Sequence, residues 1–257
     1  MGRDCFTIVA AVNDMKVLQK NLCLSPGITN DSTQLIIKRN YQSASLAYNE
    51  SIEEAENEII IFAHQDVYLP GTWFASLKQT LDYFEKEMIN WGVLGCFGMR
   101  EKSGRGIGIG RLYSNGWGIV GHEIKNPEPV QTLDEIVLVI KKSSGLRFDP
   151  TLPHFHMYGT DICMSAREKG MVSYAIPAFC VHNTNLLLSL PNDFYECYRH
   201  IKRRWGKYLP IHTSCMTISR FDKGVHERRI RELYVRLLHK EIMPTYRVED
   251  PRSLKVK

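Results

Sequence analysis

The run Ile59-Ile60-Ile61-Phe62-Ala63-His64-Gln65-Asp66-Val67 decides the fold of this chain, and Tyr68-Leu69-Pro70-Gly71 closes it. A short continuous apolar run that ends at a Pro-Gly pair is typical of a buried strand, which lies in a sheet covered on both faces. His64 and Asp66 then stand at the carboxyl end of the strand, where open α/β sheets bind ligands. The pair predicts a site for a divalent cation or a metal-bound phosphate. The alternative is a solvated strand end at which Asp66 caps the next turn.

The first hundred residues alternate between strand-like and helix-like segments. Apolar, β-rich runs predict strands, and segments with apolar residues at helical spacing predict helices between them. The expected strands are 6–12, 34–38, 59–63 and 91–97, and the expected helices are 15–24, 45–56 and 72–88. This alternation predicts an α/β fold with a mainly parallel sheet flanked by helices.

The second part of the chain follows a different pattern. Glycines recur between Gly104 and Gly121, which predicts a loop or a hairpin. Further strands are expected at 135–141, 172–176 and 179–181, and helices at 158–169, with Thr160 as N-cap, 193–208 and 225–240. We therefore expect a main domain over residues 1–190 and a basic helical extension over residues 191–257 that packs on it.

The cysteines indicate the compartment. Seven of them stand singly along the 257 residues, without a CxxC pair. An odd, scattered set is typical of free thiols in a reducing cytosol and not of a disulfide framework. No segment reaches the ~20 apolar residues that a membrane-spanning helix needs, and the apolar run at 6–12 is too short for a secretory signal. These features predict a cytoplasmic protein.

The net charge of +5 is concentrated in the last third of the chain, which is rich in lysine and arginine. A basic face suits a peripheral contact with an anionic membrane, a nucleic acid or a phosphorylated substrate. It is also typical of a solvated helix face with its own acidic partners. Nucleic acid is not expected, because the region lacks zinc-finger spacing and its aromatic residues suit packing against the main domain.

Polar residues also follow the first strand. Asn13 and Asp14 come directly after the apolar run at 6–12. If this strand and the strand before His64 are parallel neighbours, their carboxyl ends meet at one edge of the sheet. Asn13 or Asp14 would then contact a nucleotide base or ribose, although Asn-Asp after a strand also favours a simple turn.

Three further positions suit chemistry. Asp161 stands near the start of an expected helix, where it either accepts from the helix amides or acts as a general base. His154 and His156 alternate, so an extended segment would place both on one side. His182 ends an apolar strand in Cys180-Val181-His182-Asn183, where it could complete a metal site with an aspartate or be a hydrogen-bonded boundary residue.

Taken together, these segments resemble a GT-A glycosyltransferase of the family 2 type, and they come closest to its StrF-type subgroup of streptomycin biosynthesis. The resemblance covers most of the chain from Phe6 to about Asn183. The motifs that carry it are FTIVAAVND (6–14), AYNESIEEAENEIIIFAHQDVYLP (47–70), WGVLGCFG (91–98), TLDEIVLVIKKSSGLRFDP (132–150), FHMYGTDICMSAREKG (155–170) and CVHN (180–183).

The resemblance implies a Rossmann-like GT-A fold, a nucleotide-diphosphate sugar as donor, an acceptor that it does not specify, and a divalent cation, Mn²⁺ or Mg²⁺. In the family an Asp-x-Asp motif binds the cation and the ribose or diphosphate, and His64-Gln65-Asp66 stands in its place. Asp66 would be the metal ligand, and Asn13 and Asp14 would join the motif in the donor site. Because His64 replaces the first aspartate, we expect weaker binding of a hard cation or an altered cation preference.

The resemblance also implies two further roles. Thr160-Asp161 matches a Glu-Asp pair that opens a helix in the family, so Asp161 would deprotonate the acceptor hydroxyl in an inverting displacement. His182 matches a later histidine that serves some GT-A enzymes as a metal ligand. A cation and a base are needed together because the diphosphate leaving group carries charge that a metal neutralises.

Two other classes of function compete with this one. A non-catalytic GT-A-like module that only binds a nucleotide sugar would explain the altered motif. A metal-dependent hydrolase that uses His64, Asp66, His154 and His156 would hold a metal without a nucleotide. The set formed by Asp66, Asp161 and His182 favours the transferase.

Overall fold

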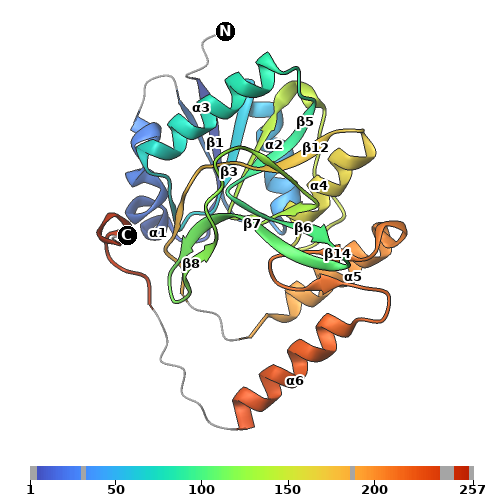
Figure 1. Cartoon of the computed structure of the whole chain (residues 1–257). Coiled ribbons are helices and arrows are strands. Elements are labelled where there is room, and N and C mark those ends of the chain that lie inside the picture. The colour runs from blue at the N-terminus through green and yellow to red at the C-terminus, as the bar shows by residue number, and fades with distance from the viewer. Residues whose placement is uncertain (1–4, 30–32, 186–188, 238–245, 255–257) are drawn as a thin grey trace.

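The computed structural model describes residues 5–29, 33–185, 189–237 and 246–254, and Figure 1 shows how they are arranged. Three lysines of the basic region, Lys240, Lys255 and Lys257, lie outside the described residues, as does the expected helix beyond residue 237. None of the helices within the described ranges is long and apolar enough to cross a membrane.

The central sheet has seven strands. In spatial order they are β2 (Gln34–Lys38), β1 (Phe6–Ala11), β3 (Ile59–Ala63), β11 (Val137–Lys141), β5 (Trp91–Gly95), β12 (Val172–Ala175) and β9 (Glu128–Val130). Strand β1 is parallel to both β2 and β3, and β12 is parallel to β5. Strand β11 is antiparallel to β3 and to β5, so those two run the same way, and β9 is antiparallel to β12. The expected mixed, mainly parallel sheet is confirmed.

Helices cover both faces of this sheet, as Figure 1 shows for α2 and α3. On β3, Ile60 and Phe62 belong to the core that contains residues of α2 (Ala44–Glu54), α4 (Tyr158–Glu168) and α5 (Asn192–Arg204). Ile61 and Ala63 belong to the core that contains residues of α1 (Met15–Lys20) and α3 (Gly71–Lys86). Both sides of β3 are therefore dry, which explains why its sequence is apolar without alternation.

A second sheet lies beside the first. Its strands are β10 (Thr132–Leu133), β6 (Phe97–Lys102), β7 (Arg105–Ser114), β13 (Val181–His182) and β4 (Val67–Tyr68), with β8 (Gly118–Gly121) paired to β7. The glycine-rich segment is thus the hairpin that the sequence predicts. Gly110 has a φ of 83°, and a Cβ there would meet the carbonyl of Cys96. Glycine is required at that point because no other residue adopts this backbone without strain and contact.

Several helices end earlier than expected, α5 at Arg204 among them, and one expected N-cap is wrong. Helix α1 ends at Lys20, and a short 3₁₀ turn, η1 (Leu22–Leu24), follows in place of one continuous helix. It ends there because the Asn21 side chain donates to the Val17 carbonyl at 2.8 Å while its backbone leaves the helical region. Helix α4 begins at Tyr158, with Met157 at its N-cap, so Thr160 is not the cap.

The C-terminal third contains three parts. Helix α5 packs into the core of the main domain, and α6 (Lys223–Leu237) projects from the body of the molecule in Figure 1. Residues 246–254, which we call the strap, contain the 3₁₀ turn η5 (Pro251–Ser253) and return to the neighbourhood of α1. The smaller elements of the whole described chain are η2 (Pro26–Thr29), η3 (Lys142–Ser144), η4 (Gly206–Tyr208), β14 (Ile211–His212) and β15 (Thr217–Ile218).

Trp205, just after α5, tests how tightly this helix is tied to the main domain. Its indole nitrogen donates to Asp161 at 2.8 Å, and both side chains are buried. Trp205→Phe should lower the free energy of unfolding by about 1–3 kcal/mol, because a buried carboxylate loses a donor. Urea denaturation measures this. Trp117→Phe, at an exposed position, should change it by less than ~0.5 kcal/mol. Equal effects in the two variants would contradict the expectation.

Candidate functional site

Asp66 lies in a tight turn between β3 and β4. The turn closes with a hydrogen bond of 3.2 Å from the Val67 amide to the His64 carbonyl. Strand β4 pairs with β13, so that His182 stands opposite Val67, and the Asn183 amide donates to the Asp66 carbonyl at 2.8 Å. The end of a central strand and a strand of the second sheet are thereby joined at Asp66.

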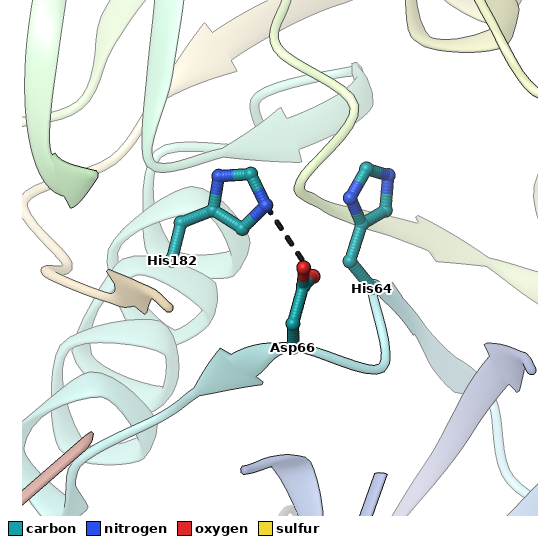
Figure 2. Close-up of side chains that lie close together, drawn as sticks. All are labelled: His64, Asp66 and His182. Atoms are coloured by element: carbon teal, nitrogen blue, oxygen red, sulfur yellow. Dashed lines mark ion pairs between the residues drawn. The ribbon is translucent and has the colours of Figure 1, made fainter. Parts of the chain in front are cut away.

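His64, Asp66 and His182 form a cluster, which Figure 2 shows in close-up. One potential ligand atom of each side chain lies within 4.8 Å of those of the other two. His182 Nε2 lies 3.3 Å from Asp66 Oδ1. Sequence reasoning placed all three at strand ends, and the fold brings them together.

His64 is available as a neutral ligand. Burial lowers the pKa of its imidazole below the ordinary value, so the ring is uncharged near neutral pH. Its Nε2 lies 2.7 Å from the Tyr158 hydroxyl, which itself donates to the Glu135 carbonyl at 3.0 Å. Because the one hydroxyl proton is used in that bond, we assign the His64 proton to Nε2, which donates to Tyr158. The lone pair is then on Nδ1.

The Asp66 carboxylate is ionised. Burial alone would raise its pKa, but contacts with His182 and with Arg247 outweigh burial and hold the pKa well below its ordinary range. Arg247 is on the strap, and its guanidinium donates to Asp66 Oδ2 at 2.8 Å. One carboxylate oxygen therefore faces Arg247 while the other faces His182. Arg247 cannot be recognised from the sequence as a site residue, because no local pattern distinguishes it from the other basic residues of its region.

A cavity of about 360 Å³ opens beside the cluster at the carboxyl ends of β1, β2 and β3. Its lining comprises Ala11, Val12, Asn13, Lys38, Asn40, Tyr41, Tyr48, His64, Gln65, Asp66, Phe155 and Tyr158. Four of the five residues predicted for donor binding, Asn13, His64, Gln65 and Asp66, thus line one cavity. The parallel pairing of β1 with β3 is what brings them together.

Asn13, Asp14 and Gln65 also hold the local backbone in place. Gln65 Oε1 accepts from the amides of Asn13 and Asp14 at 3.1 Å, and Gln65 Nε2 donates to Asn13 Oδ1. Asp14 does not line the cavity; it is the N-cap of α1, accepting from the amides of Lys16 and Val17. Its carboxylate therefore has the turn role that the sequence left open as the alternative.

Lys38, at the end of β2, adds a buried positive charge to the cavity. It pairs with Glu50 at 2.7 Å and with Glu54 at 2.6 Å, both on α2. Burial alone would lower the pKa of Lys38, but the two carboxylates raise it above the ordinary value. Asn40, the next cavity residue, has a positive φ of 62°. Strained backbone at the rim of a cavity is a common sign of a functional site.

Asp161 does not belong to the cluster or to the cavity lining. It is fully buried, and its Oδ1 accepts from Trp205 and lies 3.3 Å from Arg204 Nε, while Oδ2 accepts from the Asp149 amide at 3.2 Å. Burial raises the pKa of its carboxyl, although Arg204 and Trp205 oppose the shift. The partners thus come mainly from the end of α5 and not from the helix amides.

The other two predicted histidines lie apart from the cluster. His154 pairs with Glu196 at 2.8 Å, and His156 packs against the Phe194 ring. The four-residue set proposed for a hydrolase is therefore not brought together.

Glu135 is a titratable group that the sequence analysis did not single out. Burial and the neighbouring Asp134 raise the pKa of its carboxyl to about 8, and it accepts from the Gly159 amide at 3.3 Å. It is linked to His64 through Tyr158, which donates to the Glu135 carbonyl.

The cluster suits a divalent cation. A neutral imidazole, an ionised carboxylate and a second imidazole offer two nitrogen ligands and one oxygen ligand. Nitrogen ligands suit Mn²⁺ and the later transition metals, whereas Mg²⁺ prefers oxygen. The cluster therefore offers a mixed nitrogen and oxygen ligand set.

Comparison with known proteins gives matches to the sequence and matches to the structure. Residues 8–203 match a family described as "Glycosyltransferase like family". A protein of Fuscovulum blasticum named "ATP synthase subunits region ORF 6" is 21% identical over 194 residues, which are 72% of this chain and 76% of that protein.

Among solved structures, the TarS fragment 1-349 from S. aureus is 14% identical, over 98% of this chain and 75% of its own, with a TM-score of 0.45. The same fragment is known in complex with UDP-GlcNAc. The mannosyltransferase PcManGT from Pyrobaculum calidifontis, solved with GDP-Man and Mn²⁺, is 10% identical over 68% of this chain and 56% of its own, with a TM-score of 0.41. A mixed sheet with helices on both faces is the architecture expected of a GT-A fold.

The histidine of the motif gives a direct test of cation preference. His64→Asp restores two carboxylates, so it should shift the ratio of the Mg²⁺ and Mn²⁺ dissociation constants toward Mg²⁺ by on the order of tenfold. Calorimetric titration of each cation measures the ratio. His122→Asp introduces the same charge at an exposed position and should leave the ratio unchanged. An unchanged ratio in His64→Asp would show that His64 is not a ligand.

Proposed function

The chain belongs to the glycosyltransferase-like family that its residues 8–203 match, and on that premise we propose that it is a sugar transferase. It would transfer a sugar from a nucleotide-diphosphate sugar to an acceptor hydroxyl. The transfer would invert the anomeric carbon and would use a divalent cation. The observation that supports this best is the His64-Asp66-His182 cluster, two members of which, His64 and Asp66, line the strand-end cavity. Family membership favours the enzyme, and the non-catalytic binding module is not favoured. Placement in the StrF-type subgroup is part of the proposal.

The donor would lie with its nucleoside in the cavity and its diphosphate at the cluster. Asn13 offers an amide to the base or ribose, and Tyr41 and Tyr48 offer aromatic rings and hydroxyls. His64, Asp66 and His182 would hold the cation, which when bound neutralises charge on the diphosphate as it leaves. We propose Mn²⁺ as the preferred ion because two of the three ligands are imidazoles.

Asp161 is proposed as the general base. In the transfer, the acceptor oxygen forms a bond to the anomeric carbon, the bond from that carbon to the diphosphate oxygen breaks, and the acceptor proton passes to the carboxylate. Burial raises the pKa of Asp161, which makes it a stronger base. Because the side chain is fully buried, the acceptor reaches it only when Trp205 or another neighbour moves.

The acceptor side would involve α6 and a membrane surface. Ile230, Leu233, Tyr234 and Leu237 recur at i, i+3, i+4 and i+7, and each is between 58% and 68% exposed. Basic residues outnumber acidic ones in the sequence of α6. The five basic residues are Lys223, Arg228, Arg229, Arg231 and Arg236, and the two acidic ones are Glu227 and Glu232. An exposed apolar stripe on a basic helix suits the interface of an anionic membrane. We propose that α6 makes a peripheral contact of this kind.

A cytoplasmic location fits this arrangement. All seven cysteines are free thiols, as a reducing compartment requires. A nucleotide-sugar enzyme that lies against an anionic inner surface would also meet its donor there.

Removal of the base tests the reaction. Wild-type protein with Mn²⁺ should release the nucleoside diphosphate from one member of a panel of nucleotide sugars, with water as the acceptor. Asp161→Asn should lower kcat by about 10²–10⁴-fold while the dissociation constant of the donor stays within about twofold. Asp149→Asn is the matched control, since Asp149 is also buried and pairs with the same Arg204. Normal turnover by Asp161→Asn would refute the base, and no release from any donor would refute the transferase.

The membrane contact is tested with vesicles. Wild-type protein should sediment with vesicles that contain phosphatidylglycerol and not with neutral phosphatidylcholine vesicles. Leu233→Ser combined with Leu237→Ser should weaken this binding by about tenfold or more, because each leucine loses apolar area that the interface would bury. Met88→Ser, at an apolar residue that lies just after α3 and is 89% exposed, should have no effect. Equal binding to neutral and anionic vesicles would contradict the proposal.

A further inference from the structure

Arg247, on the strap, contacts the candidate cation site. Its guanidinium donates to Asp66 Oδ2 at 2.8 Å, across 181 positions of sequence. The side chain is 30% exposed, and its Nε is buried. Among the described residues, the Nε proton has no hydrogen-bond partner, so the guanidinium has donor capacity that the protein does not use.

The strap is held in place without the Arg247 side chain. Asn183 donates to the Val248 carbonyl and accepts from the Val248 amide, both at 2.9 Å. Asn115 donates to the Tyr246 carbonyl at 2.7 Å, and Asn185 accepts from the Arg247 amide at 3.0 Å. These bonds fix the backbone on both sides of Arg247. The fold therefore presents a positive charge to Asp66, which lines the cavity, from a backbone that is already anchored.

The pairing also sets the charge of the site. The Arg247 guanidinium lies 2.8 Å from Asp66 Oδ2, so the two opposite charges balance each other before any ligand binds. A bare divalent cation would have to approach a guanidinium, and this repulsion disfavours it. A diphosphate brings negative charge that satisfies both the cation and the guanidinium. The cation and the diphosphate are therefore expected to bind better together than either does alone.

Guanidinium groups suit phosphate oxygens because their donors form a planar fork. Building on the glycosyl transfer proposed above, we propose that Arg247 is a donor-binding residue whose guanidinium binds the terminal phosphate of the nucleoside diphosphate. Without donor, Asp66 is its partner. When the cation and the nucleotide sugar bind together, Asp66 binds the cation. The Arg247 guanidinium then donates its hydrogen bonds to the phosphate. As the sugar leaves, Arg247 stabilises the charge that remains on the diphosphate.

Calorimetry with Arg247→Gln tests this inference, and Arg252→Gln is the matched control. Arg252 lies on the same strap but pairs with Asp250, away from the cluster, so its variant removes the same charge without touching the site. The diphosphate probes are UDP, GDP, CDP, ADP and dTDP, each added with Mn²⁺. Two further probes are the monophosphate of the nucleoside that binds best and Mn²⁺ alone. Electron paramagnetic resonance measures the free Mn²⁺.

Arg247→Gln should weaken binding of the best diphosphate by about 10–100-fold and reduce its advantage over the monophosphate, because the lost bond is charge-assisted. Mn²⁺ alone should bind more tightly to this variant, since the repulsion is gone. Arg252→Gln should match the wild-type protein in both respects.

Diphosphate binding within twofold of wild type in Arg247→Gln would overturn the inference, whether or not Mn²⁺ binding changes. Arg247 would then serve only as the ion-pair partner of Asp66. That result leaves the proposed transferase standing, because the wild-type protein still binds a diphosphate. If the wild-type protein binds none of the five diphosphates, the proposed function fails and this inference fails with it.

Discussion

The buried carboxylate of Asp66 is the point at which three distant parts of the chain meet. A charge that is removed from water must be paired and hydrogen-bonded, or the folded state loses several kcal/mol. Asp66 meets this requirement with His182 from the second sheet and Arg247 from the strap, and its backbone carbonyl accepts from Asn183. The second sheet is joined to the first at this turn through the pairing of β4 with β13, and Arg247 adds a bond from the strap.

The central sheet could be predicted from the sequence because burial on both faces leaves a direct trace. Ile60 to Ala63 are fully buried and have no polar alternation, and the Pro-Gly pair marks where the buried strand must have ended. The convergence of Asn13 with the motif followed from one assumption, the parallel pairing of β1 with β3, which is confirmed. Strand ends are thus well predicted where strand order is simple.

The partners of the site residues could not be predicted in the same way. Arg247 reaches Asp66 through a strap that no hydrophobic period marks, and Trp205 reaches Asp161 from the end of α5, 44 positions away. For Asp14, in contrast, a local rule is sufficient. The preference of aspartate for the N-cap position accounts for its contacts with the first amides of α1. Pairings between distant side chains depend on tertiary packing, and a single sequence contains no signal for them.

The central claim is that the cluster holds a cation and the phosphates of a nucleotide at the same time. Crystals soaked with Mn²⁺ and the best-bound nucleoside diphosphate, with diffraction recorded at the manganese edge, test it most directly. The account predicts one anomalous peak between His64, Asp66 and His182, with phosphate oxygens in its coordination sphere and the nucleoside in the cavity. A peak at another place, or manganese at the cluster with no nucleotide beside it, would contradict the account.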